Sequence, residues 1–238
     1  MKTPMVVLVH GAWHGGWCWS ALQSELDRRG VPSLAPDLPG HGSSNDALGS
    51  LDHDARSIAT LIRRLDRPVV LVGHSYGGMV VTEACGMSDQ VRSLVYVAAF
   101  MGDIGESPMS LLGSFEPRDV ALSAVMRPGP TEETTTIDPA GAIDAFYHLS
   151  STEVGKSASE RLDAQHMGGF MQPLTSAGWR SVRSTYVVCS QDRALHPDHQ
   201  AEMARRASSA VVLESDHSPF LCRVVELADI VSGVANSV

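Results

Sequence analysis

The sequence lacks the features that mark disordered, secreted or membrane-spanning proteins. Charged residues make up only 19% of its 238 residues, whereas hydrophobic residues make up 43%, and this is too little charge for a disordered chain. No apolar run approaches the roughly 20 residues that span a bilayer. The run at 5–9 is also shorter than a signal-peptide core of ~7 to 15 residues. A globular, cytoplasmic protein is therefore expected.

Basic residues are also in short supply. The chain has 18 lysines and arginines against 27 acidic residues, which gives a formal net charge of −9. Such a field repels phosphate backbones and anionic membranes. A small molecule is therefore expected as the partner, rather than a nucleic acid or a membrane, and a homodimer stays open.

The cysteines lie far apart and include no CxxC pair. A chain of this length does not depend on disulfides for stability, and the spacing matches no metal-binding pattern. Reduced thiols without a catalytic or metal-binding role are therefore expected at Cys18, Cys85, Cys189 and Cys222.

Short apolar runs rich in β-branched residues recur along the chain. Runs of this kind are typical of strands buried on both faces, and helical patterns lie between most of them. The alternation predicts an α/β fold, with a mostly parallel sheet of about six strands flanked by helices. The predicted strands are 5–9, 31–35, 69–72, 94–99, 185–189 and 210–213.

One connection is much longer than the others, since residues 100–184 separate two predicted strands. The excess predicts an inserted cap, residues 101–175, on a core of residues 1–100 and 176–238. A cap in this place would cover the crevice where open α/β sheets bind ligands.

Within the cap, helices are predicted only at 142–149 and 158–167. The stretch TEETTT at 131–136 is predicted to be a solvated turn. The prolines, which interrupt long helices, are Pro108, Pro117, Pro128, Pro130 and Pro139.

A GxSxG motif, residues 73–77, stands between a predicted strand and a predicted helix. This is the context in which a sharp turn exposes a nucleophilic serine. Glycines are needed because the chain reverses within a few residues and its backbone segments come too close for a Cβ atom. Ser75 is therefore the candidate nucleophile.

A serine hydroxyl is a weak nucleophile at neutral pH and requires a base and an orienting carboxylate. Asp192 and His217 each follow a predicted strand directly, as Ser75 does. The carboxyl ends of parallel strands share one edge of a sheet, so these side chains are expected to converge. Asp103, which follows the strand at 94–99, is an alternative acid.

Hydrolysis through a serine also needs two N–H groups directed at the oxyanion that develops on the substrate. One candidate is the N–H of Tyr76, at the start of the helix that follows the nucleophile. The other is the N–H of Ala12, in the glycine-containing loop HGAWHGG at 10–16. Each donor is worth ~2.7 to 4 kcal/mol of transition-state stabilisation.

Five segments together resemble the α/β-hydrolase superfamily: HGAWHGGWCW, PDLPGHG, GHSYGG, SQDRAL and DHSPF. They are most similar to its branch of plant methyl esterases, hydroxynitrile lyases and bacterial carboxylesterases related to pyrethroid hydrolases. The resemblance implies that Ser75 is the nucleophile, His217 the base and Asp192 the acid, with Ala12 and Tyr76 as N–H donors.

The chain departs from the lyases of that branch at two positions. Those lyases carry a threonine after the first histidine and, directly after the catalytic histidine, a lysine that helps to hold cyanide. This chain has Gly11 and Ser218 there, which favours ester hydrolysis over cyanohydrin cleavage.

Several residues beside these motifs are candidates for substrate contacts. Gly11, Trp13, Phe100 and Met101 are expected to line the site, whereas at least two of the three tryptophans Trp13, Trp17 and Trp19 are expected to pack against the sheet.

Histidines are frequent near the motifs. His10 and His74 are expected to bond the backbone, and His14 is expected either to line the pocket or to brace the oxyanion loop. His196 and His199 lie three residues apart but have no completing ligand set, so no metal is expected.

The sequence thus predicts a serine carboxylesterase that hydrolyses a small hydrophobic ester through an acyl-enzyme, without a metal or organic cofactor. A hydroxynitrile lyase, or other acyl or C–C chemistry, on the same triad is one alternative. A ligand receptor that keeps the hydrolase fold is another.

Overall fold

A computed structural model describes residues 3–238. Its main sheet has six strands in the order β2-β1-β3-β4-β8-β9, and every pairing is parallel. The strands are β1 (Met5–Val9), β2 (Ser33–Leu34), β3 (Val69–His74), β4 (Val91–Val97), β8 (Arg183–Cys189) and β9 (Ser209–Leu213). The predicted fold class is therefore confirmed.

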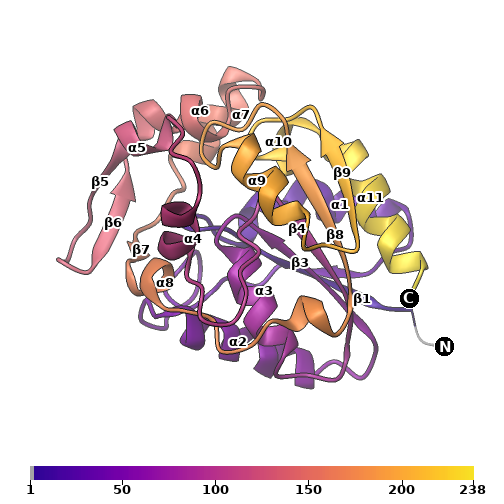
Figure 1. The fold of residues 1–238 in the computed structure, drawn as a ribbon. Helices are drawn as coiled ribbons and strands as arrows, with labels where there is room; N and C mark the ends of the chain where they lie inside the picture. The colour runs from indigo at the N-terminus through magenta and orange to yellow at the C-terminus, as the bar shows by residue number, and fades with distance from the viewer. Residues whose placement is uncertain (1–2) are drawn as a thin grey trace.

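Helices cover both faces of this sheet (Figure 1). On one face lie α1 (Ser20–Arg28) and α11 (Val224–Asn236), preceded by the short helices η1 (Gly16–Trp19) and α10 (Pro219–Cys222). On the other lie α2 (Leu51–Arg63), α3 (Gly77–Cys85) and α9 (Pro197–Ala204). None of the helices in residues 3–238 has the length and apolar character needed to cross a membrane.

Side chains alternate between the two faces of each strand, and this divides the core in two. In β1, Val7 and Val9 pack with α2 and α3, whereas Val6 and Leu8 pack with α1 and α11. The near-continuous apolar strands follow from this burial on both faces.

One predicted strand is shorter than expected. The run at 31–35 forms only the two-residue β2, paired with Val6 and Val7. Pro32 and Pro36 flank this strand, and proline has no N–H to donate to a sheet.

The segment predicted to be a cap, residues 101–175, contains more regular structure than the sequence predicts. Its helices are α4 (Pro108–Ser114), α5 (Leu122–Val125), α6 (Pro139–Phe146), α7 (Thr152–Ser159) and α8 (Gly168–Met171). A small antiparallel sheet joins β5 (Met126–Pro128), β6 (Thr134–Ile137) and β7 (Gln165–His166). The helix η2 (Gly178–Arg180) follows this segment. Figure 1 shows β5, β6, α5 and α6 of the predicted cap at the upper left of the core.

Two predictions for the cap were wrong in part. Residues 131–133 form an exposed turn as predicted, but residues 134–136 belong to strand β6. Most of 158–167 lies outside a helix, because the chain there extends into β7 and bonds to the core. The helices of residues 101–175 have at most eight residues each, as expected of a segment whose prolines interrupt long helices. Pro108 and Pro139 begin two of them, since proline is tolerated at the first helical position, where no N–H is needed.

Candidate active site

Ser75 lies at a tight turn between β3 and α3. Its φ of +50° is in the left-handed region, and its backbone is held by bonds from its N–H to Val97 O (3.2 Å) and from Phe100 N–H to its carbonyl (3.0 Å). A Cβ added at Gly73 would come within 2.6 Å of Gly77 O. The turn therefore requires glycine there, and it holds a strained backbone at the candidate nucleophile.

Asp192 and His217 form a buried pair at the same edge of the sheet. His217 Nδ1 donates to Asp192 Oδ2 at 2.6 Å, and the two residues are 2% and 4% exposed. Gln200 Nε2 also donates to Oδ2, at 2.7 Å, while the N–H groups of Ala194 and Leu195 donate to Oδ1. With four donors on its two oxygens, the carboxylate has a fixed orientation toward the imidazole.

His74 connects this pair to the turn that carries Ser75. Its Nε2 donates to the carbonyl of His217 at 2.8 Å, and the two rings are 4.5 Å apart between centroids. Within residues 3–238 the Ser75 hydroxyl makes no hydrogen bond. The Asp192–His217 pair thus lies against the residue next to Ser75, and the Ser75 hydroxyl is left free. Catalytic hydrogen bonds are often formed only in the substrate complex.

Two backbone N–H groups beside Ser75 are also free. Those of Ala12 and Tyr76 donate no hydrogen bond to any group within the described residues. Ala12 is buried in the loop after β1, and Tyr76 caps the N-terminus of α3. Gly11 directly precedes Ala12, and a Cβ added at Gly11 would meet His74 Nδ1 at 2.8 Å and Ser75 Cβ at 2.9 Å. The absence of a side chain at Gly11 therefore lets the loop approach the turn.

The neighbouring histidines are neutral and bond the backbone. His10 Nδ1 donates to Gly11 O at 2.8 Å, and His10 Nε2 accepts from Leu38 N–H at 3.0 Å. Burial lowers the pKa of His10 to about 3 and that of His14 to about 4. Burial also holds the pKa of His74 well below its usual value. These imidazoles act as fixed donors and acceptors near neutral pH.

Aromatic side chains of residues 101–175 pack against the site, and no sequence motif identifies them. Phe146, at the end of α6, lies 5.6 Å from the His217 ring and 6.2 Å from Trp13 between centroids. Phe170 in α8 lies 5.5 Å from Trp13 and 5.7 Å from Tyr76. Apolar rings therefore pack against the candidate site.

The four residues expected to contact substrate are all in or next to this region. Gly11 and Trp13 belong to the loop that carries Ala12, and Phe100 bonds the Ser75 carbonyl. Met101 is fully buried, and its N–H donates to the Met203 sulfur at 3.3 Å. Of the other tryptophans, Trp19 is buried against α1 and α11, and the ring of Trp17 lies under Arg161.

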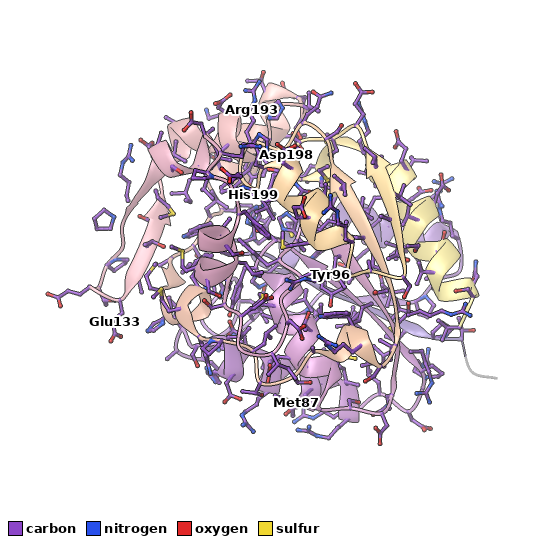
Figure 2. All side chains as sticks on the ribbon, in the orientation of Figure 1. Met87, Tyr96, Glu133, Arg193, Asp198 and His199 are labelled. Carbon is purple, nitrogen blue, oxygen red and sulfur yellow. The ribbon has the colours of Figure 1, made fainter. Side chains whose placement is uncertain are left out.

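The alternative acid does not pair with His217. Asp103 forms an ion pair with Arg180, which also holds the pKa of this carboxyl below its usual value. His196 and His199 also bond elsewhere: the His196 side chain caps α9, and His199 Nε2 donates to Glu116 O at 2.8 Å. Figure 2 shows His199 and Asp198 where α9 faces the cap.

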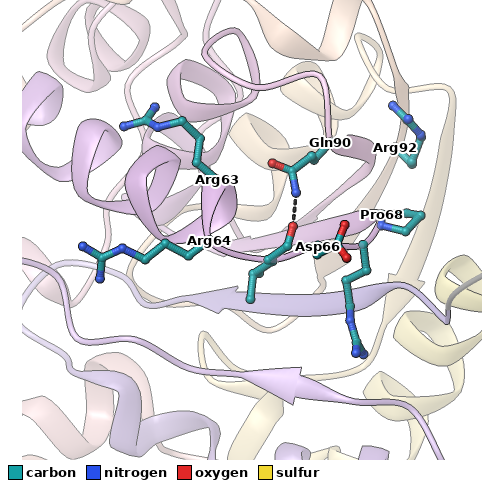
Figure 3. A pocket seen from close by; sticks show the side chains of 8 residues that line it. Arg63, Arg64, Asp66, Pro68, Gln90 and Arg92 are labelled. Atoms are coloured by element: carbon teal, nitrogen blue, oxygen red, sulfur yellow. Dashed lines mark hydrogen bonds between the residues drawn. The ribbon is translucent and has the colours of Figure 1, made fainter.

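A large open surface pocket, of about 720 Å³, lies away from these residues. It is at the opposite edge of the sheet, where β3 and β4 begin, and Figure 3 shows Arg63 and Arg64 extending away from Arg92. Because these guanidinium groups diverge, they do not form a single anion site.

Asp54 in α2 is a buried carboxyl directly behind Tyr76. Tyr76 Oη donates to Asp54 Oδ2 at 2.7 Å, and Asp54 Oδ1 has no partner within residues 3–238. Burial raises the pKa of Asp54 to about 7. As the pH rises, the unfolded chain loses this proton before the folded protein does. The contribution of Asp54 to the free energy of folding therefore becomes steadily less favourable from about pH 4 to about pH 7 and stays unfavourable above that.

Asp54→Asn is expected to remove this dependence, because an amide does not ionise and its oxygen still accepts from Tyr76. The difference in unfolding free energy between the variant and the wild type should grow in favour of the variant by roughly 2–4 kcal/mol from pH 4 to pH 8. Denaturant titrations of both proteins at each pH would measure it, and a constant difference would contradict the assignment. Taking the difference cancels the buried histidines, which act in the opposite direction.

Comparison with known proteins gives the family. A model described as "Alpha/beta hydrolase family" matches residues 6–230. Methylesterase 2 of Arabidopsis thaliana is 30% identical over 97% of this chain and 95% of its own.

Two solved structures are also similar. A methylesterase from Arabidopsis is 27% identical with a TM-score of 0.82, covering 99% of this chain and 100% of its own. A pyrethroid hydrolase from Sphingobium faniae superposes with a TM-score of 0.88 at 22% identity, covering 99% of this chain and 98% of its own. The branch that the sequence motifs predict is confirmed, and the chain belongs to the α/β-hydrolase family.

Proposed function

We propose that this protein is a serine carboxylesterase that hydrolyses a small, hydrophobic ester through an acyl-enzyme. The observation that carries the proposal is the buried Asp192–His217 pair, bonded at 2.6 Å, beside a strained turn that presents Ser75. The similarity to proteins named as a methylesterase and a pyrethroid hydrolase supports an ester as the substrate.

In this mechanism, His217 Nε2 takes the proton of the Ser75 hydroxyl while the oxygen attacks the ester carbonyl. The tetrahedral anion accepts hydrogen bonds from the N–H groups of Ala12 and Tyr76. His217 then gives its proton to the departing alcohol oxygen, which leaves the acyl group on Ser75. Water then attacks the acyl carbon and gives a proton to His217, which returns the proton to Ser75 Oγ as the carboxylic acid leaves.

Asp192 serves this cycle without exchanging a proton. Its Oδ2 accepts from Nδ1, which leaves the other nitrogen of His217 as the base facing Ser75. When His217 is protonated, the carboxylate stabilises the positive charge. The four donors on the carboxylate keep it in this position throughout.

The rings above the site support an apolar substrate. The rings of Trp13, Phe146 and Phe170 pack together there, and an alkyl or aryl group that binds against them gains free energy because its own apolar surface leaves water. A bulky charged acyl group would lose its hydration without a partner.

A fluorophosphonate probe with a panel of methyl, aryl and bulky alkyl esters tests the proposal. Mass spectrometry of the labelled protein should find the phosphonyl group on Ser75, and prior labelling should abolish hydrolysis of whichever esters are turned over. A label on another side chain, or ester hydrolysis that survives complete labelling, would overturn it. Tight ligand binding without turnover of any ester would instead favour a receptor.

A further inference from the structure

The loop that carries Ala12 is held on both sides of that residue. The peptide that contains the Ala12 N–H also contains the Gly11 carbonyl, and this carbonyl accepts from His10 Nδ1 (2.8 Å) and His14 N–H (3.3 Å). In a trans peptide the N–H and C=O groups point in opposite directions. Fixing the Gly11 carbonyl therefore fixes the direction of the Ala12 N–H.

The next peptide is held by the His14 side chain. His14 Nδ1 lies 2.8 Å from the Ala12 carbonyl. A carbonyl only accepts, so Nδ1 carries the proton and donates. In the neutral ring Nε2 is then an acceptor, and burial keeps His14 neutral, with a pKa of about 4.

The partner of His14 Nε2 comes from the cap. The Tyr147 hydroxyl lies 2.8 Å from Nε2 and donates to it, and Tyr147 is fully buried immediately after α6. A directed chain of two hydrogen bonds thus runs from the cap, through His14, to the carbonyl of Ala12.

The same part of the cap contacts the other half of the site. Leu149 N–H donates at 2.8 Å to Oδ2 of Asp216, the residue just before His217. Phe146 lies against the His217 ring. One cap segment, residues 146–149, therefore contacts both the oxyanion loop and the loop of the base.

We propose that Tyr147, acting through His14, is a positioning residue for the Ala12 N–H, so that stabilisation of the oxyanion depends on the contact between the cap and the core. This inference rests on the proposed function. Neither residue touches the reacting atoms, and their effect is to restrict the peptides on both sides of Ala12 to one orientation.

Tyr147→Phe removes the hydroxyl and keeps the ring. For an ester that the wild type hydrolyses, we expect kcat to fall about three- to ten-fold, as for a lost neutral hydrogen bond, with KM little changed. Affinity for a trifluoromethyl ketone, whose adduct carries the oxyanion, should fall by a similar factor. Affinity for the carboxylic acid product should not change.

Tyr96→Phe is the matched control. Tyr96, labelled in Figure 2, is equally buried, and its hydroxyl bonds Thr82 Oγ1 at 2.7 Å between β4 and α3. Loss of this hydroxyl should lower stability to a similar degree without lowering kcat. Equal kcat values for the two variants would overturn the proposal.

A double-mutant cycle tests the route through His14. In a His14→Phe background, Tyr147→Phe should have little further effect on kcat, because the bond it removes is already gone. Full additivity would contradict the route. These outcomes are read only where the unlabelled wild type hydrolyses the ester and the probe modifies Ser75. Failure of the proposed function would appear in the wild type itself and is therefore distinct from failure of this inference.

Discussion

Ser75→Ala is expected to lower kcat for ester hydrolysis by roughly 10⁴- to 10⁶-fold, because no other group would form the acyl bond. The fold should be unaffected. The Ser75 hydroxyl makes no hydrogen bond within residues 3–238, and alanine keeps the Cβ atom at this positive-φ position.

Steady-state hydrolysis of a p-nitrophenyl ester, followed together with thermal unfolding, measures both effects. The melting temperature should stay close to that of the wild type while turnover approaches the buffer rate. A folded Ser75→Ala protein that still hydrolyses the ester at more than a few per cent of the wild-type rate would exclude Ser75 as the nucleophile. His217→Ala should give a loss of the same order, because the two residues act as a unit.

Asp192→Asn is expected to lower kcat by about 10³- to 10⁴-fold while the site keeps its shape. The asparagine oxygen can still accept from the N–H groups of Ala194 and Leu195, so its NH₂ group would occupy the place of Oδ2. In the wild type, Oδ2 accepts hydrogen bonds from His217 Nδ1 and Gln200 Nε2. An NH₂ group in its place cannot accept them, because it is itself a donor. The imidazole would then favour the tautomer in which the nitrogen facing Ser75 carries the proton and cannot act as a base.

Asp103→Asn is the control for this experiment. Asp103 also follows a strand of the sheet, but it pairs with Arg180 near the surface. We expect near-wild-type kcat for this variant. If Asp103→Asn lost activity and Asp192→Asn kept it, the acid would be assigned to the wrong residue.

The sequence was sufficient for the sheet and for the residues at its carboxyl edge. Buried parallel strands require short apolar runs, and six such runs were recognisable without a structure. Because parallel strands end at one edge, the residues that follow them converge. The buried pair of Asp192 and His217 beside the Ser75 turn therefore lies where the spacing predicts.

The cap could not be predicted to the same degree. Its helices and strands are short, and their placement depends on contacts with distant residues. The bond of Asp163 N–H to Trp13 O and that of His41 to Gln165 draw the chain out of the helix predicted at 158–167. The limits of the cap at 101 and 175 stay a prediction.

Composition and local pattern by themselves determined the α/β class, the family motifs and the residue types available for catalysis, because each depends on neighbours along the chain. Only the tertiary structure decided that Asp192 rather than Asp103 faces His217, that Phe146 and Phe170 roof the site, and that His14 connects Tyr147 to Ala12. These contacts join residues far apart in sequence, and their geometry exists only after the cap has packed on the core.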